Sequence, residues 1–311
     1  MAPLLKKFTF TNAPAGARPH AAVELTPEGA LAAAIPNGAE APVYAFTPLR
    51  PGALSPGIGG ANILAPDAVA ETLRTALDQV SPRSRAVTVI VPDTAARVFV
   101  LDFDTLPPKS PDVVYPVLRF RMRKMVPFEV EHAAVSYQIL SQNPGGGEGS
   151  VKVLVTIMPR AILAEYESAV QAAGYEPGVV LLSSLASLAA LTVPEPALAA
   201  NLSSTALTTS ITRGDDLLLY RTQELPAENE MRVGEVQRSI AVAAAYFEDK
   251  VGSVPRQLHY AGVVPAYDFA RAIGDTGLEV VETAPTPSTG AVTVMGPIGF
   301  AGVAGALAGA A

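Results

Sequence analysis

The sequence predicts a mixed α/β protein built from two lobes, and three observations support this. The chain has 311 residues, about twice the size of a typical domain. Hydrophobic residues make up 49% of it and charged residues 16%, which is enough for a large core and excludes disorder throughout. In both halves, short apolar runs typical of strands alternate with segments of helical periodicity. We expect the second lobe to begin after Pro194 and Pro196.

The first elements surround a tight turn. We expect strands over Ala21–Leu25 and Ala30–Ile35, joined by Thr26-Pro27-Glu28-Gly29, where proline restricts φ and glycine accepts a positive φ. The stretch Thr47–Ala61 is interpreted as a mobile loop. Apolar residues then recur on one face of a helix over Asp67–Val80, and the preceding proline suits a first helical turn.

The remaining elements follow from the same patterns. Strands are predicted over Ala86–Val91, Val98–Phe103, Val135–Leu140, Val151–Ile157 and Val179–Leu182, and helices over Pro116–Met125, Arg160–Ala173 and Ser183–Leu191. Asn143–Ser150 is expected to be a flexible connection. The second half predicts a hairpin of Thr205–Thr212 and Leu217–Arg221, helices over Val233–Val251, Pro265–Ile273 and Pro297–Ala308, and strands over Gln257–Tyr260 and Leu278–Glu282.

Composition excludes several classes of function. The net charge of −7 and the pI near 5.1 argue against a nucleic-acid binder. The chain has no cysteine, hence no disulfide and no thiolate metal site, and its three histidines are scattered, so we expect no bound metal. The opening residues lack the apolar core of a signal peptide. The apolar end, 297–311, is shorter than the ~20 residues that span a bilayer and is expected to be a packed helix.

A search for catalytic motifs finds little. There is no G-x-x-x-x-G-K-[ST] or G-x-S-x-G motif, and Gly57-Ile58-Gly59-Gly60 follows prolines rather than a strand, so we interpret it as structural. Asp102 and Asp104 flank Phe103 at the end of a predicted strand and would share one face. Such a pair could bind a cation or serve acid–base chemistry, but a solvated strand end is the commoner explanation.

One basic segment stands out in this acidic chain. Arg119, Arg121, Arg123 and Lys124 precede Val126-Pro127-Phe128. The segment is either a solvated helix face or a docking site for an acidic partner, which could be a protein or an anionic membrane surface.

Several stretches in order resemble the type IV pilus assembly protein PilM family, actin-like relatives of the cell-division protein FtsA. They are VTVIVPDTAARVFVLDFDTLP, YPVLRFRMRKMVPFEVEHAAVSYQIL, the junction AGYEP, the helix signature EVQRSI and the small-residue end GVAGAL. The similarity covers roughly residues 85–311. It implies an α/β, actin/hexokinase-like (ribonuclease H-like) two-lobe fold with a small inserted subdomain. The implied boundaries are 1–105 and 159–196 for the first lobe, 106–158 for the inserted subdomain, 197–295 for the second lobe and 296–311 for a terminal helix packing back on the first lobe.

The resemblance also places a nucleotide site, because actin-like proteins hold ATP phosphates between two strand-turn-strand loops. The corresponding residues here are Glu24, Thr26, Asn201, Ser203, Ser204 and Thr208, and Gly262 lies on the strand that would meet the adenosine. No Asp-x-Gly stands in the first loop, Pro27 removes a backbone donor, and Asn201 replaces an aspartate that would act on hydrated Mg²⁺. We therefore expect no required cofactor, weak or absent binding of ATP and Mg²⁺, and no catalytic residues.

Finally, the resemblance implies a partner. In the family, a groove between the inserted subdomain and the adjoining lobe captures the cytoplasmic tail of PilN, an inner-membrane protein. This implicates Pro107–Ser150, with Arg119, Arg121, Arg123 and Phe128 as contacts. The implied function is a cytoplasmic scaffold of a type IV pilus or related secretion machine, tied to the inner membrane only through its partner and able to form homo-oligomers. The alternatives are an actin-like ATPase using Asn201, Ser203, Ser204 and Thr208, and a small-molecule kinase relying on Asp102 and Asp104.

Overall fold

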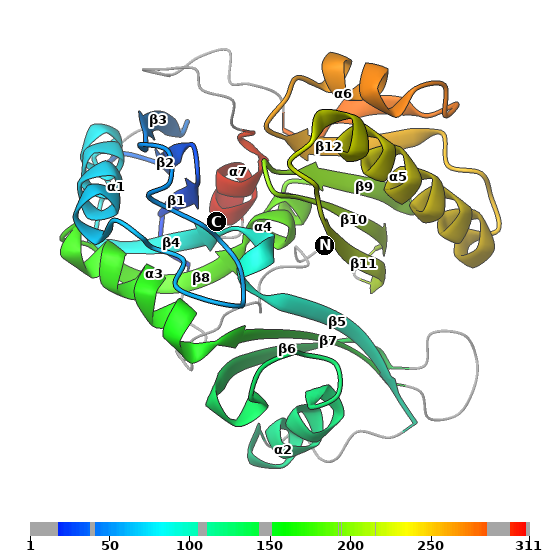
Figure 1. Ribbon diagram of the computed structural model, residues 1–311, viewed down its shortest axis with the longest axis horizontal. Coiled ribbons are helices and arrows are strands. Elements are labelled where there is room, and N and C mark those ends of the chain that lie inside the picture. Colours follow the sequence, from blue (N-terminus) through cyan, green and yellow to red (C-terminus); the bar gives the residue numbers. More distant parts are fainter. Residues whose placement is uncertain are drawn as a thin grey trace.

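The computed structural model describes residues 18–37, 41–104, 111–142, 151–191, 193, 195–214, 216–284 and 299–308. These residues form two lobes side by side, each built on a mixed sheet, and a smaller subdomain beneath them (Figure 1). The predicted α/β class is confirmed. Among the described helices, none is long and apolar enough to cross a membrane.

The first lobe is a five-stranded sheet in the order β3-β2-β1-β4-β8. Its strands are β1 (Ala21–Thr26), β2 (Gly29–Ala34), β3 (Val43–Pro48), β4 (Ala86–Val91) and β8 (Glu176–Leu182). β1 to β3 form an antiparallel meander, whereas β4 and β8 run parallel to β1 and β4 respectively. Helices α1 (Pro66–Val80) and α3 (Arg160–Ala172) pack together on one face, and α4 (Ser183–Ala189) and α7 (Ala301–Ala308) pack together on the other (Figure 1).

The second lobe repeats this plan with the order β11-β10-β9-β12-β13. Its strands are β9 (Ala197–Leu202), β10 (Ala206–Arg213), β11 (Asp216–Glu224), β12 (Gln257–Gly262) and β13 (Glu279–Glu282). Helices α5 (Asn229–Val251) and α6 (Ala266–Ile273) supply apolar side chains to a separate core. The turns β1–β2 and β9–β10 therefore occupy equivalent positions in the two lobes.

The inserted subdomain is a three-stranded antiparallel sheet in the order β5-β7-β6. It comprises β5 (Arg97–Phe103), α2 (Pro111–Met122), β6 (Ala133–Gln142) and β7 (Val151–Pro159), with short 3₁₀ turns at Asp93–Ala95 and Val130–His132. One face of the sheet packs on α2. From the other face, Val98, Val100 and Leu140 pack against the core of the first lobe.

The structure differs from the predicted elements in a few places. β3 and β9 were not predicted. The Ala-rich run of β9 carries little strand signal, whereas β3 contains strong strand formers and was missed within a Pro-, Gly- and Ala-rich stretch. Helix α2 begins at Pro111 and keeps Pro116 within its second turn. The predicted flexible connection Asn143–Ser150 lies outside the described residues, as do Pro107 and Pro108.

The loop after β3 is held in place, contrary to the mobility expected for Thr47–Ala61. The Asn62 amide donates to the carbonyls of Gly57 (2.8 Å) and Gly60 (3.1 Å) and accepts from Tyr166 of α3 (3.0 Å). The carboxylate of Glu165 accepts from the backbone N–H groups of Asn62 and the following residue. One buried asparagine thus fixes the glycine-rich stretch against α3, so its role is structural as predicted.

Candidate functional site

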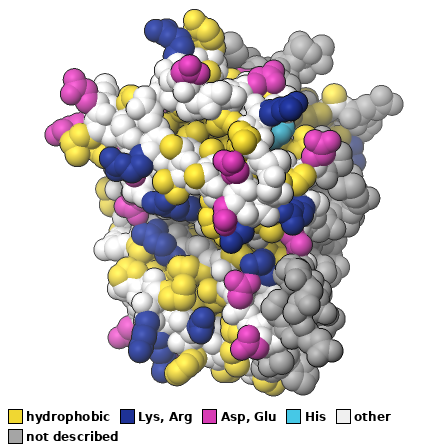
Figure 2. All heavy atoms as spheres, turned by 90° about the vertical axis from the view of Figure 1, so that its right-hand side faces the viewer, with side chains coloured by type: hydrophobic (Ala, Val, Ile, Leu, Met, Phe, Trp, Pro, Cys, Tyr) yellow, Lys and Arg dark blue, Asp and Glu magenta, His cyan; other side chains and the backbone are white. Residues whose placement is uncertain are grey.

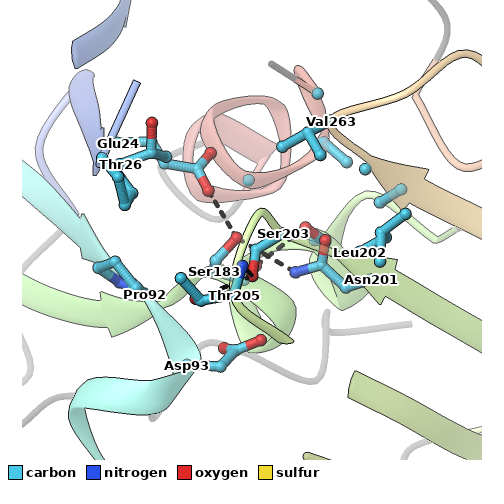
Figure 3. Close-up of a pocket in the computed structure, with 17 residues that line it drawn as sticks. Glu24, Thr26, Pro92, Asp93, Ser183, Asn201, Leu202, Ser203, Thr205 and Val263 are labelled. Atoms are coloured by element: carbon cyan, nitrogen blue, oxygen red, sulfur yellow. Dashed lines mark hydrogen bonds between the residues drawn. The ribbon is translucent and has the colours of Figure 1, made fainter. Parts of the chain in front are cut away.

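The candidate site is a cavity between the two lobes. Its empty volume is about 530 Å³, a value that includes open solvent at its mouth. It lies where the turns β1–β2 and β9–β10 face each other, with α4 and α7 between them (Figure 3). Most of the lining is contributed by small or polar residues: Glu24, Thr26, Pro27, Pro92, Asp93, Ser183, Ser187, Asn201, Leu202, Ser203, Thr205, Ala261, Gly262, Val263, Gly299, Ala301 and Gly302.

Glu24 on β1 places a carboxyl group in this cavity. The residue is 6% exposed; its Oε1 accepts from Ser183 Oγ (2.5 Å), and its Oε2 is buried without a hydrogen-bond partner. Burial raises the pKa of Glu24 to about 7; the Ser183 hydrogen bond lowers it in part and the nearby Asp93 charge raises it. A Cβ atom at Gly302 would lie 2.3 Å from Oε2, so a larger residue at this position of α7 would have to displace the carboxyl group. Glu24 is thus partly uncharged at neutral pH.

A chain of hydrogen bonds connects Glu24 to the second lobe. Asn201 Nδ2 on β9 lies 3.1 Å from Ser183 Oγ at the start of α4, and Ser183 in turn contacts Glu24 (Figure 3). With its amide turned over, Asn201 accepts from the Ser184 N–H (2.9 Å) and donates to the Ala261 carbonyl (3.3 Å), and the contact with Ser183 is kept. The Glu24-Ser183-Asn201 chain therefore links β1 and β9 across the floor of the cavity.

A second buried carboxyl group, that of Asp93, connects the lobes more tightly. It accepts from the Ser184 N–H (3.1 Å), from Ser184 Oγ (2.8 Å) and from Thr208 Oγ1 on β10 (2.8 Å). Ser184 Oγ also contacts the Tyr220 hydroxyl on β11. Burial raises the pKa of Asp93, whereas hydrogen bonds from these three residues lower it. Because Asp93 lies just after β4 and α4 covers the same sheet, whereas Thr208 belongs to the second lobe, this carboxyl group joins the two lobes.

The β9–β10 turn, which would hold phosphates in an actin-like protein, is closed by its own side chain. Ser203 Oγ accepts from the N–H groups of Thr205 (3.2 Å) and Ala206 (2.9 Å). Arg232 of α5 donates to the carbonyls of Ser203 (2.9 Å) and Ser204 (2.7 Å) from the other side. Two backbone donors that could have met an anion are therefore already used.

The structure brings together most of the residues that the sequence analysis assigned to a nucleotide site. Five of the seven line the cavity: Glu24, Thr26, Asn201, Ser203 and Gly262. The other two do not line it; Ser204 turns a buried hydroxyl away, and Thr208 bonds to Asp93. Asp93 and Ser183 were not singled out, because neither belongs to a local motif and their roles depend on contacts between distant segments.

These residues do not fit a magnesium nucleotide. Among the described residues that line the cavity, none has a cationic side chain, and two have carboxyl groups. Pro27 provides no N–H in the first turn, and Ser203 occupies two N–H groups of the second. A Cβ atom at Gly299 would lie 2.8 Å from the Gly262 carbonyl oxygen, so the chain before α7 lies directly on the segment expected to meet an adenosine. Among the described residues, no acidic or histidine cluster could hold a metal.

The predicted partner-binding residues lie in the inserted subdomain, where two of them make internal contacts. The Arg119 guanidinium donates to the carbonyls of Val130, Glu131 and Ala133, and Arg123 forms an ion pair with Glu131. Arg121 is exposed and Phe128 packs on the subdomain core.

The carboxylate pair of the kinase alternative also lies in the inserted subdomain. Asp102 forms an ion pair with Lys152 of the neighbouring strand (2.7 Å), and Asp104 is exposed. Neither carboxylate lines the cavity between the lobes. The pair on which the kinase alternative relied therefore does not lie beside the expected phosphate site.

Comparison with known proteins defines the fold. No family model matches the sequence, and no curated protein sequence is significantly similar to it. The solved PilM-PilN type IV pilus biogenesis complex contains a chain that matches with a TM-score of 0.72 and 18% identity, over 95% of this chain and 100% of that one. The cytoplasmic domain of EpsL, an inner-membrane component of the type II secretion system of Vibrio cholerae, matches with a TM-score of 0.50 and 13% identity, over 92% of each chain.

A third match is a Bacteroides thetaiotaomicron protein described as having an actin-like ATPase fold and unknown function. Its TM-score is 0.50 and its identity 12%, over 84% of this chain and 90% of that one. The protein therefore has the actin-like fold, as the sequence predicts.

Proposed function

We propose that this protein is a PilM-like assembly component of a type IV pilus or a related secretion machine. In this role it captures the cytoplasmic tail of an inner-membrane partner and stays cytoplasmic, held at the membrane by that partner. The observation that carries the proposal is the likeness to a chain of the PilM-PilN complex over 95% of the present chain. The likeness to EpsL adds a second membrane-associated machine in which this fold serves at the inner membrane.

The cavity between the lobes supports a role that does not depend on nucleotide hydrolysis. In the first turn Pro27 has no backbone N–H, and in the second Ser203 already accepts from two backbone N–H groups. The carboxyl groups of the cavity are hydrogen-bonded to neighbouring elements. A fold that lacks the phosphate chemistry of its class still offers its surfaces for assembly. In this proposal the cavity holds the lobes in one arrangement, and binding occurs elsewhere.

The proposed tail site is the junction between the first lobe and the inserted subdomain. The loop held by Asn62 stands at this junction, because Thr94 at the start of the subdomain donates to the Pro56 carbonyl (3.2 Å) and α3 leads out of β7. Ile58 near the tip of this loop is partly exposed, as are Val98 and Leu140 on the sheet face turned to the first lobe. An apolar junction of this kind, with β6 as an edge strand of the inserted sheet, suits an extended peptide that pairs along a strand and places alternate side chains in pockets.

Of the four contacts expected in the inserted subdomain, Arg121 remains the best candidate. The guanidinium groups of Arg119 and Arg123 are engaged within the subdomain, and Phe128 supports its core. The proposal therefore assigns tail capture to the apolar junction and gives the basic helix a secondary role.

The test compares two variants for binding of a fluorescent peptide, the cytoplasmic tail of the PilN-type membrane protein from the same cell. Ile58→Glu puts a charge at the apolar junction and is expected to weaken binding at least about tenfold, as loss of an interface anchor does. Met231→Glu makes a matched change at an exposed position of α5 and is expected to bind like the wild type. No binding by the wild-type protein, or equal loss in both variants, would contradict the proposal.

A further inference from the structure

The outer face of α2 carries exposed apolar side chains next to basic ones. Phe120 is 74% exposed, Val113 45%, and Met125 just after the helix 41%. Val113, Phe120 and Lys124 are spaced by seven and four residues, so they share one side of the helix and its continuation, and the exposed Arg121 flanks that side. The opposite side, with Val114, Leu118 and Met122, is buried in the subdomain core. The exposed side therefore contributes nothing to the core.

The charge of this face is opposite to that of the molecule. The chain has a net charge of −7, yet residues 113–128 include four basic side chains and no acidic one. Arg119 and Arg123 are engaged in internal contacts, which leaves Arg121 and Lys124 exposed beside Phe120. A negatively charged surface would be repelled by the net charge of the chain and attracted by Arg121 and Lys124. The exposed Asp112 and Glu129 flank this segment and weaken the attraction, and the remaining local charge favours one orientation.

The position and shape of the face favour a flat, deformable partner. α2 covers the outer side of the inserted sheet at the end of the molecule farthest from β13 and α6 (Figure 1). Figure 2 shows basic and hydrophobic side chains next to one another at this lower end. Phe120 projects from a helix surface, and a projecting aromatic ring flanked by cations is the arrangement found in proteins that contact the interface of a bilayer.

We propose that this α2 face (Val113, Phe120, Arg121, Lys124 and Met125) contacts an anionic lipid bilayer directly. The inference rests on the proposed function only in placing the protein at an inner membrane. Two cations and three apolar side chains give weak binding alone, but a protein already held by a partner's tail experiences a high effective lipid concentration. The contact would then set the orientation of the whole molecule on the membrane.

The chain contains no tryptophan, which allows a site-specific test. Phe120→Trp places a single reporter on the face, and Tyr267→Trp places one at a position of α6 that is 72% exposed on the second lobe. Both full-length proteins are mixed with vesicles of phosphatidylglycerol or of phosphatidylcholine at millimolar lipid, which is enough to detect weak binding, without any tail peptide. We expect a blue shift at position 120 with phosphatidylglycerol, quenched by brominated lipid, and no shift at position 267.

Charge reversal provides the second arm. Arg121→Glu with Lys124→Glu in the Phe120→Trp background is expected to lower vesicle binding about tenfold or more. No shift at position 120 with phosphatidylglycerol, or equal shifts at both positions, would overturn the proposal. A blue shift of the tryptophan emission with polyglutamate but not with vesicles would assign the face to an acidic protein instead. A blue shift that depends only on protein concentration would assign the face to a second copy of the chain. Each of these results leaves tail binding untouched, so the two proposals fail separately.

Discussion

Glu24→Gln tests the electrostatics of the cavity between the lobes. The Glu24 carboxyl group is buried, with one oxygen hydrogen-bonded to Ser183 and the other without a partner. Burial raises its pKa from 4.5 to about 7. Because the folded-state pKa is the higher one, the stabilisation is complete below pH 4.5 and is lost as the pH rises through about 7. Above that pH the folded protein must hold a buried, poorly compensated charge.

The magnitude follows from the two pKa values. The pKa of Glu24 rises from 4.5 to about 7, and each pKa unit corresponds to ~1.4 kcal/mol. The charged carboxylate therefore lowers the free energy of unfolding of the wild type by ~3 kcal/mol at pH 8. A glutamine at position 24 cannot ionise, so this loss disappears in the variant. Its amide nitrogen would lie against Gly302 without an acceptor, which costs ~1 kcal/mol at every pH. The variant should therefore be less stable than the wild type at pH 4.5 and more stable by ~2 kcal/mol at pH 8.

The assay is urea unfolding followed by circular dichroism between pH 4.5 and 8. The free energy of unfolding of Glu24→Gln minus that of the wild type should rise by ~3 kcal/mol over this range, whatever its starting value. Ser183→Ala removes the hydrogen bond that lowers the pKa of Glu24, so in that variant the loss of stability should still begin near pH 4.5 but continue to higher pH and become larger. A difference between Glu24→Gln and wild type that does not change with pH would refute the reasoning.

Two further predictions concern how the elements are held together. Asp93→Ala should lower the free energy of unfolding by about 3 kcal/mol or more in urea titrations, because it leaves the buried donors of Ser184 and Thr208 unsatisfied. Asp93→Asn keeps an acceptor and should lower the free energy of unfolding by less. Equal losses in the two variants would contradict this prediction. Gly305→Ala should destabilise the protein by ~1–3 kcal/mol, because the added Cβ would lie 1.9 Å from the Ala186 carbonyl oxygen. Gly234→Ala lies in open space on α5 and should stabilise the protein by ~0.5–1 kcal/mol. Thermal melts that rank the two variants in the opposite order would contradict the packing of α7.

The sequence was sufficient for the class of fold because each long element carries its own pattern. The apolar run Ala86–Val91 and the helix beginning at Pro66 are recognisable from local residues alone. β9 was missed because its Ala-rich sequence acquires strand character only by pairing with its neighbours, whereas β3 carries local strand formers that the surrounding Pro- and Gly-rich sequence obscured. Pro116 was expected to begin a helix, but it lies one turn inside α2, where packing of the apolar face outweighs the lost hydrogen bond.

The candidate site was predictable only in part. Glu24 and Asn201 were located through the positions of two turns, and both line the cavity. Asp93 depends on donors that come from 91 and 115 residues further along the chain, so no local pattern points to it. The use of the turn amides by Ser203 could not be foreseen either, because a serine in a turn can equally point to solvent.

The central claim is that the protein binds a partner's tail and does so without nucleotide. The most direct measurement is isothermal titration of the full chain with the cytoplasmic tail peptide of the PilN-type protein, in the absence and in the presence of ATP and Mg²⁺ at millimolar concentration. The account predicts the same Kd in both titrations and no heat of binding for ATP alone. Tail binding that requires ATP, or the absence of tail binding under both conditions, would contradict it.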